Sequence, residues 1–428
     1  FDASSYVDAR WVSACINSPT QLITSYSSRT PKQIDWLTEE KAKQLFNPLQ
    51  TVKPVFKSHP NIVLIILESF GRDYCGFLNK EKRFTPFLDS LASLSLVFPH
   101  AYSSGTTSME SIPAIFASIP SLLEVPYINS TFQNNTVHGI HDYLSKLKYD
   151  CSFYYGARNG SMGFDNFLKI SGPISYYGLN EYPNGKADFD GHWGIWDEEY
   201  LQYFAKELTK KQSPFFSSVF TLTSHDPYQI PERYRSVFTA DELPIHKSVQ
   251  YTDYALRRFF ETIWKSKLTA NTIFIITADH PSHSLNEYFY TPTGKYEIPL
   301  MIYAPKYIKP GINDSITASH PDIMPTVLSL AGVKTPFFSF GKSLLTDEYR
   351  TAINYDNGLV QLIDYPMCIR RYPDGNSVMH IQPKYTPNSK IIYKLTPEEK
   401  LHKQMLDTLL QAKYQTYING LLNNKLNK

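Results

Sequence analysis

The heptapeptide NIVLIIL, residues 61–67, constrains the fold of this chain more than any other segment. It is a continuous apolar run rich in β-branched side chains. Such a run is typical of a strand that is buried on both faces, as in a parallel sheet covered by helices. The segment therefore predicts a strand at the centre of an α/β protein.

Strand-like and helix-like patterns alternate after this segment. Helix-like patterns occupy residues 84–95 and 321–332, and the second ends at Gly332. Three more apolar runs have the length and composition of strands: 215–223, 271–277 and 298–305. This alternation predicts the α/β fold class, with a doubly wound, mostly parallel central sheet flanked by helices.

The two ends of the chain have different patterns. Residues 1–58 lack strand patterning and indicate short helical pieces, followed by an extended segment at Leu49–Phe56. From about Asn354 the pattern changes to short strands (377–382 and 390–395) and a charged amphipathic helix, Pro397–Leu422. We therefore expect three parts: a helical linker segment (1–58), a main domain (59–350) and a small C-terminal α+β subdomain (351–428).

Composition excludes some classes of function. The chain of 428 residues has 42 Lys and Arg against 40 Asp and Glu, a balance that argues against nucleic acid as a partner. Its four cysteines have no Cys-x-x-Cys spacing, which argues against a thiolate zinc cage. No apolar run approaches the roughly 20 residues that a membrane span needs, so we expect this chain itself to be soluble.

Polar side chains follow three of the predicted strands. Glu68 comes directly after the first strand, His225 lies two residues past the second, and Asp279-His280 lies just past the third. Ligands of open α/β sheets bind at the carboxyl ends of strands, so these side chains should converge. Each alone has an ordinary explanation, as a helix cap or a hydrogen-bonded turn. Together they favour a site for Zn²⁺ or Mn²⁺, whose ligands include Glu, Asp and His.

A candidate nucleophile lies in the segment SSGTTSMESIPAIFASIP, residues 103–120. Three consecutive hydroxyls, those of Thr106, Thr107 and Ser108, precede an apolar helical pattern. A hydroxyl there could be activated by a metal, and the helix N-terminus would favour a phosphate. The alternative is that Ser108 or Ser111 only caps the helix. Capping and catalysis are compatible, and these residues alone do not select one hydroxyl.

Several motifs together resemble the alkaline phosphatase/sulfatase superfamily, in particular its lipoteichoic acid synthase-like branch of phosphoglycerol and phosphoethanolamine transferases, in its Bacteroidetes-type form. The motifs run in the family's order over about residues 60–345; among them are LIILESFGRDY, TPFLDSLA, SMESIPAIFASIPSL, TLTSHDPYQIPERY, TIFIITADH and DIMPTVLSLAGV. The resemblance implies one divalent metal, Mn²⁺ or Zn²⁺, held by Glu68, Asp279, His280 and the nucleophilic hydroxyl. It also implies that His225 binds the transferred phosphate group.

Spacing within this resemblance favours Ser108 as the nucleophile. In the branch, the nucleophile stands ten residues before the small residue of a Ser-hydrophobic-Pro triplet, and here that count runs back from Ser118 to Ser108. In phosphoethanolamine transferases it precedes a proline by five residues, and Pro113 gives the same answer. Most relatives use threonine, however, and alignment forward from Gly105 favours Thr107, which we otherwise expect to contact substrate.

The chain departs from the family pattern around the substrate pocket. Tyr155 stands where lipoteichoic acid synthases carry a histidine, and the segment MGFD, 162–165, lacks their Trp and Arg. Arg158 and Trp193 are candidate substitutes for binding substrate. The alternatives are a surface loop charge for Arg158 and a core position for Trp193.

The resemblance implies a phosphotransferase. Ser108 would attack the headgroup phosphodiester of a phospholipid donor and pass the group to an envelope glycan or lipid acceptor. Family members have an N-terminal membrane anchor, absent from this chain, and act on the extracytoplasmic (periplasmic) face of the inner membrane. The alternatives are a sulfatase, a phosphodiesterase or phosphatase, and an inactive binding module. The segment SMESI, 108–112, lacks the Pro and Arg of the C/S-x-P-x-R motif of sulfatases, and the full ligand set argues against an inactive module.

Overall fold

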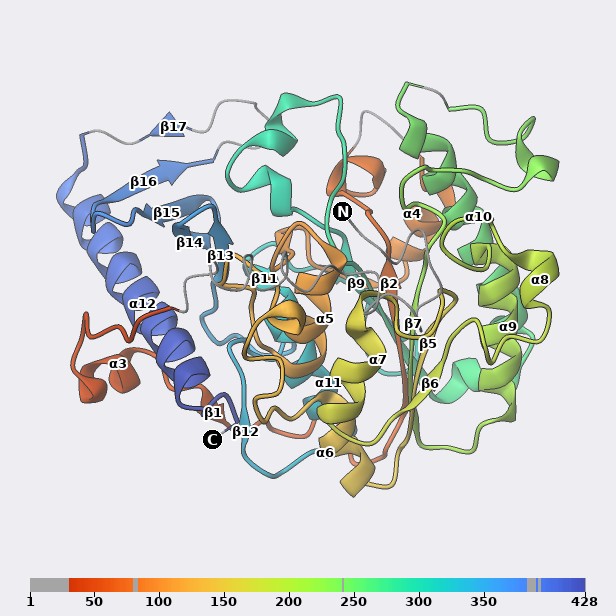
Figure 1. The fold of residues 1–428 in the computed structure, drawn as a ribbon, viewed down its shortest axis with the longest axis horizontal. Helices are drawn as coiled ribbons and strands as arrows, with labels where there is room; N and C mark the ends of the chain where they lie inside the picture. Colours follow the sequence, from red (N-terminus) through yellow and green to blue (C-terminus); the bar gives the residue numbers. More distant parts are fainter. Residues whose placement is uncertain (1–30, 80–83, 241, 383–389, 392–393, 428) are drawn as a thin grey trace, which may run out of the picture.

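The computed structural model describes residues 31–79, 84–240, 242–382, 390–391 and 394–427. Its centre is an eight-stranded sheet in the order β10-β3-β9-β8-β2-β7-β5-β6 (Figure 1). The strands are β2 (Asn61–Leu67), β3 (Leu96–Val97), β5 (Asp150–Tyr155), β6 (Ser175–Tyr177), β7 (Phe215–Phe220), β8 (Thr272–Ala278), β9 (Leu300–Tyr303) and β10 (Gly311–Ile312). Only β9 runs antiparallel to its neighbours. The predicted mostly parallel sheet is confirmed.

Strand β2 is the centre of the sheet, with the bounds that its sequence predicts. Every residue of β2 is buried, and parallel partners β7 and β8 lie on its two sides. A strand in this position contacts apolar groups on both faces, which explains why it has no polar alternation.

Helices cover both faces of the sheet (Figure 1). One face carries α5 (Ser108–Ala117), α6 (Ile140–Lys146), α7 (Phe164–Ile170) and α11 (Ile323–Ala331). The other carries α4 (Pro86–Ala92), α9 (Asp197–Lys210) and α10 (Pro244–Trp264), with the short α8 (Gly185–Asp188) at the edge. The buried carboxylate of Asp253 on α10 accepts the N–H groups of Phe87 and Leu88, both at 2.9 Å, and so caps α4 from outside. Burial raises the pKa of Asp253 to about 7.

The C-terminal part forms a separate antiparallel sheet with one long helix. Its strands are β13 (Ala352–Asp356), β14 (Leu359–Asp364), β15 (Met367–Arg371), β16 (Ser377–Ile381) and β17 (Lys390–Ile391). Helix α12 (Pro397–Leu422) packs across this sheet with its predicted bounds, and an Arg371–Asp407 ion pair of 3.1 Å joins the two. The sequence predicts only the last two strands, so three strands were missed.

The described part of the N-terminal segment packs on the body of the protein. Helix α3 (Glu39–Leu45) lies beside α12 (Figure 1). Strand β1 (Leu49–Gln50) pairs with β12 (Phe337–Phe338), so the predicted extended segment is a strand only at its start. Residues 1–30 of the predicted linker lie outside the described residues. None of the helices in the described ranges combines the length and apolar composition needed to cross a bilayer.

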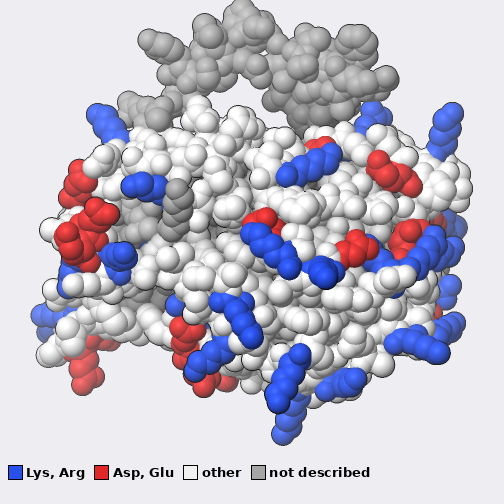
Figure 2. Space-filling view, turned by 90° about the horizontal axis from the view of Figure 1, so that it is seen from below, with Lys and Arg blue, Asp and Glu red and all other residues white. Residues whose placement is uncertain are grey.

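Acidic and basic side chains both occur on the face of the molecule that Figure 2 shows. Figure 2 views the molecule from below, from the end of the sheet where β5 begins, and basic side chains outnumber acidic ones on the visible described surface. The acidic side chains lie among the basic ones, so no patch of one sign covers this face. The polar side chains that follow β2 and β8 leave the sheet at the opposite end, away from this surface.

Candidate metal centre and nucleophile

The register of the sheet brings the strand-end residues together. Ile66 pairs with Phe220 on β7 and with Thr277 on β8. Two residues further along their strands, Glu68 and Asp279 therefore leave the sheet side by side, and both side chains are almost completely buried. Two carboxylates in such a site repel each other unless a cation or protons lie between them.

Ser69 holds both carboxylates in place. Its hydroxyl donates to Oε1 of Glu68 at 2.6 Å, and its backbone N–H donates to Oδ1 of Asp279 at 2.7 Å. This needs a left-handed backbone, with φ of 58°, which costs a serine about 1 kcal/mol or more. The backbone of Glu68 is fixed as well, by the hydroxyls of Thr221 at 2.9 Å and Ser224 at 2.6 Å.

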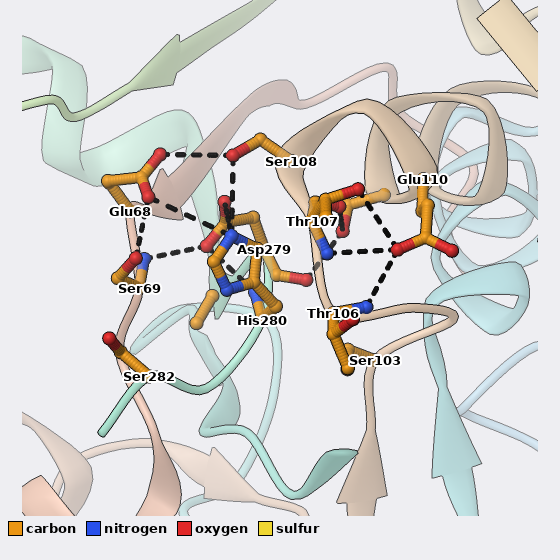
Figure 3. Close-up of polar contacts among 12 residues, drawn as sticks. Glu68, Ser69, Ser103, Thr106, Thr107, Ser108, Glu110, Asp279, His280 and Ser282 are labelled. Carbon is orange, nitrogen blue, oxygen red and sulfur yellow. Dashed lines mark hydrogen bonds and ion pairs between the residues drawn. The ribbon is translucent and has the colours of Figure 1, made fainter. Parts of the chain in front are cut away.

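His280 completes a group of three possible ligands (Figure 3). Its Nδ1 lies 2.8 Å from the carbonyl oxygen of Pro281, which can only accept, so Nδ1 carries the hydrogen. In the neutral ring Nε2 then offers a lone pair, 3.1 Å from Oδ2 of Asp279 and 3.8 Å from Oε1 of Glu68. Oδ2 of Asp279 is buried and has no hydrogen-bond donor among the described residues. One nitrogen and two carboxylates thus converge with lone pairs available, as a small divalent cation requires.

Burial and mutual charge change the acidity of these groups. Burial raises the pKa of Asp279, and the nearby charge of Glu68 raises it further. Burial lowers the pKa of His280, but the carboxylates of Asp279 and Glu68 outweigh it and leave this pKa above its usual value. Protons and a cation therefore compete for the same atoms.

The hydroxyls of Thr107 and Ser108 point in different directions. Ser108 is the first residue of the helix, and its Oγ donates to Oε2 of Glu68 at 3.2 Å and lies 3.4 Å from Nε2 of His280 (Figure 3). Thr107 is the N-cap, and its hydroxyl donates to Glu110 at 3.0 Å. The same carboxylate oxygen accepts the N–H groups of Thr106 and Thr107 at 2.8 and 3.0 Å. Ser108 therefore faces the carboxylates while Thr107 caps the helix.

Ser111 does not cap the helix either. Its hydroxyl donates to the backbone carbonyl of Asp279 at 2.5 Å, one turn beyond Ser108. This bond ties helix α5 to the end of strand β8. The alternative in which Ser108 or Ser111 serves only as a cap is therefore wrong.

His225, on the loop after β7, contacts Trp193, which lies on the segment before α9. Their rings are 4.1 Å apart, and both donate to the carbonyl oxygen of Asp226, from Nδ1 at 2.9 Å and from the indole at 2.7 Å. Trp193 is half-buried and sits on a loop, rather than in the core. The loop that carries His225 adjoins the metal centre, because Ser224, the residue before His225, donates to the carbonyl of Glu68.

Arg158 lies further out. It follows β5 and is exposed, with its guanidinium 5.7 Å from the ring of Phe189. No carboxylate in the described ranges forms an ion pair with it, and no contact joins it there to Glu68 or Ser108. It lines a groove of about 1160 Å³ together with Asn180, Lys186 and Phe189.

Several residues that shape the site were not anticipated. Buried Asp197 accepts the N–H groups of Leu222 and Thr223 at 2.7 and 3.2 Å, which fixes the start of the His225 loop. Burial raises its pKa to about 6. Nothing local marks this residue in the sequence. Glu110 did carry a signal, because Thr107 and Glu110 have the spacing of a capping box.

Comparison of the sequence with known proteins identifies the family of this chain. The sulfatase family model matches residues 60–333, which is more than half of the chain. A lipoteichoic acid synthase-like protein of Bacillus subtilis (strain 168), YvgJ, is 25% identical over 333 residues, 71% of this chain and 53% of its own length. Lipoteichoic acid synthase of Staphylococcus aureus (strain USA300) is 27% identical over 331 residues, 71% of this chain and 50% of that protein. The chain thus spans about half the length of these curated relatives.

Solved structures show the same fold. A protein of the alkaline phosphatase superfamily from Vibrio parahaemolyticus superposes with a TM-score of 0.77 at 24% identity, over 96% of this chain and 98% of that one. The lipoteichoic acid synthase LtaP from Listeria monocytogenes gives 0.66 at 17% identity, over 90% and 98%. The resemblance inferred from the motifs is therefore confirmed. Because the family model covers more than half of the chain, including β2, α5, β7 and β8 with the loops that follow them, the chain belongs to the sulfatase family.

Proposed function

We propose that this protein is a metal-dependent phosphotransferase that forms a covalent intermediate on Ser108. Its donor would be a phospholipid with a phosphoglycerol- or phosphoethanolamine-type headgroup, and its acceptor an envelope glycan or lipid. One observation carries the proposal. The Ser108 hydroxyl donates to Glu68 and lies beside His280, whereas the Thr107 hydroxyl donates to Glu110. The similarity to lipoteichoic acid synthases supports the choice of donor and acceptor.

Glu68, Asp279, His280 and Ser108 would hold one Mn²⁺ or Zn²⁺. The residues present fit such an ion, because Oδ2 of Asp279 has no hydrogen-bond partner among the described residues and Nε2 of the neutral His280 ring offers a lone pair beside it. When bound, the ion supplies positive charge that lowers the pKa of a serine hydroxyl and neutralises charge on a phosphate. The N-terminus of α5 adds backbone N–H groups for the phosphate oxygens.

His225 would act on the transferred group. Because Nδ1 of His225 donates to the carbonyl of Asp226, Nε2 is the nitrogen left for substrate. The ring of Trp193 restricts the rotation of the imidazole from one side. Nε2 would bind a phosphate oxygen or protonate the oxygen of the departing diacylglycerol.

The donor also suggests where the protein acts. A phospholipid is reached at a membrane surface, and one of the named relatives is a lipoteichoic acid synthase. We propose that an N-terminal anchor in the full-length protein holds this chain at the extracytoplasmic face of the inner membrane, in the periplasm.

The test is an assay with headgroup-labelled phosphatidylglycerol and phosphatidylethanolamine vesicles, with Mn²⁺ or Zn²⁺. We expect release of diacylglycerol and a phosphoglycerol or phosphoethanolamine adduct on the peptide that contains residues 106–108, detected by mass spectrometry. Transfer of label to an added glycan or lipid acceptor separates a transferase from a phosphodiesterase. Hydrolysis of sulfate esters without any adduct from phospholipid would overturn the proposal in favour of a sulfatase.

Substitution of His225 should affect turnover and leave the fold intact. We expect His225→Ala to lose about 10²–10⁴-fold in kcat, the range typical of a general acid or base. Its melting temperature and metal content should stay at the wild-type values, because the half-buried side chain fills no core space. The control is His283→Ala, an exposed histidine past the Asp-His pair, which should keep full activity. A large drop in melting temperature for His225→Ala would instead assign it a structural role.

Metal affinity should fall as the solution becomes more acidic. Burial raises the pKa of Asp279 to about 7, so this carboxylate takes up a proton as the pH falls from 8 to 6. The pKa of His280 is raised as well, because the carboxylates of Asp279 and Glu68 outweigh the effect of its burial. A metal must displace those protons, which costs about tenfold in affinity per pH unit for each proton displaced. Titration calorimetry with Mn²⁺ in two buffers of different ionisation enthalpy measures both the affinity and the proton release. An affinity that is equal at pH 6 and pH 8 contradicts the ligand assignment.

A further inference from the structure

His320 connects two parts of the candidate site without touching its ligands. It is the first residue of a short 3-10 helix, His320–Asp322, and its side chain is completely buried. Its Nδ1 lies 3.1 Å from the backbone nitrogen of Ser104, and its Nε2 lies 2.8 Å from the carbonyl oxygen of Ala278. Ser104 is four residues before Ser108, and Ala278 directly precedes Asp279.

The two partners fix the form of the imidazole. A carbonyl can only accept, so Nε2 carries the hydrogen, and a backbone N–H can only donate, so Nδ1 is the bare nitrogen. The ring must be neutral to make both bonds. Burial lowers the pKa of His320 to about 4, in agreement with that form.

The fold delivers His320 to this position. Strand β11 (Ala318–Ser319) pairs in parallel with β4 (Ala101–Tyr102), with Ser319 opposite Tyr102. The residues that follow these two strands, His320 and Ser103, therefore begin side by side. His320 in this way reaches the loop that leads to α5. A second hydrogen bond holds the same loop at Ser103, whose N–H donates to the carbonyl of Tyr296 at 2.8 Å.

We propose that His320 is a positioning residue that sets the place of Ser108 relative to Asp279 and His280. The imidazole is a rigid bridge between the backbone of the nucleophile loop and the end of the strand that carries the two ligands. Its effect on turnover rests on the proposed function, whereas its effect on the loop does not.

Three substitutions separate the bridge from simple packing. His320→Leu fills the space but leaves the Ser104 N–H and the Ala278 carbonyl without partners. His320→Gln restores one donor and one acceptor at a similar separation, and His320→Asn is too short to reach both. We expect His320→Leu to lose about 10²-fold in kcat, the scale of a misplacement of about 1 Å, with KM for the donor within about threefold. Gln should recover most of that loss and Asn only part of it.

A matched control exists in another buried histidine. His141 lies away from the site, and its Nε2 contacts the carbonyl of Leu168 at 2.8 Å. Burial lowers the pKa of His141 to about 4 as well. His141→Leu should lower the melting temperature and leave kcat unchanged. A role limited to packing predicts instead that the two Leu variants behave alike.

Hydrogen exchange followed by mass spectrometry gives a readout that needs no enzyme activity. Exchange in the segment 103–108 should speed up in His320→Leu, stay slow in His320→Gln and be unchanged in His141→Leu. If this pattern holds but no donor is turned over by the wild type, the bridge stands and the proposed function fails. If exchange in this segment is unchanged in His320→Leu, or if Gln behaves as Leu does, the proposal is overturned. Should the Leu variant not fold, the comparison of Gln with Asn decides the same question.

Discussion

Ser108→Ala is expected to abolish both turnover and the covalent adduct. Its Oγ is the only one of the three consecutive hydroxyls that contacts Glu68 and lies beside His280. Removal of an enzyme nucleophile costs on the order of 10⁴-fold or more in kcat. Steady-state kinetics with a phospholipid donor, together with mass spectrometry of the peptide that contains residues 106–108, measure both effects. Ser108→Thr should retain some activity, since the change adds only a methyl group.

The neighbouring hydroxyls serve as controls for this prediction. Thr107→Ala removes the helix cap, so it should lower the free energy of unfolding by about 1 kcal/mol while the adduct stays on Ser108. Thr106→Ala keeps the N–H that Glu110 accepts, and should change neither the adduct nor the stability by much. An adduct on Thr107, with turnover retained in Ser108→Ala, would show that the nucleophile is misassigned.

Asp279→Ala is expected to reduce bound metal from about one ion per chain to almost none, and activity with it. The substitution removes one of the three members of the only group of possible metal ligands found in the described ranges. Elemental analysis of the purified variant measures the loss. Asp279→Asn separates the loss of the carboxylate ligand from the loss of a hydrogen bond, because its amide oxygen can still accept the Ser69 N–H that Asp279 accepts. We expect both variants to lose metal, although only Asp279→Ala loses that hydrogen bond.

Asp253→Asn is the matched control for the metal prediction. Asp253 is another buried carboxylate with a raised pKa, but it caps α4 and lies on α10. Its substitution should alter stability and leave the metal content unchanged. Metal content that is unchanged in Asp279→Ala as well would contradict the ligand assignment.

The parts of the fold that the sequence predicts are those with strong local patterns. Strand β2 and helix α12 have their predicted bounds, since one is a continuous apolar run and the other begins at a Thr-Pro cap. Parallel strands place their carboxyl ends at one edge, so the convergence of Glu68 with Asp279 also followed from the sequence. The count to Ser108 rested on spacing, and the structure directs that hydroxyl toward Glu68.

Three C-terminal strands were missed although one signal was present. The dipeptide Asn357-Gly358 has positive φ at both residues, 50° and 87°, and joins β13 to β14 as a tight hairpin. Such a dipeptide between apolar runs is a strong hairpin signal. The strands themselves mix apolar with charged residues, because Arg371 pairs with Asp407 on α12. That contact depends on the tertiary fold and leaves no local pattern.

Residues that orient the site were beyond sequence reasoning for a different reason. The Ser69–Asp279 bond joins positions 210 residues apart, and the Ser104–His320 bond joins positions 216 residues apart. No periodicity or short motif encodes such a contact. It becomes visible only when the sheet order and register are known.

The C-terminal sheet reaches into the loop that precedes Ser108. The side-chain amide of Asn354, in β13, donates to the carbonyl of Ser103 at 2.7 Å, and the hydroxyl of Tyr296 donates to the carbonyl of Tyr355 at 3.2 Å. The small sheet therefore supports the backbone that leads to Ser108, and we expect changes in this hairpin to affect the chemistry. Damage to the hairpin would first loosen the backbone that carries Ser108, while the central sheet was still intact.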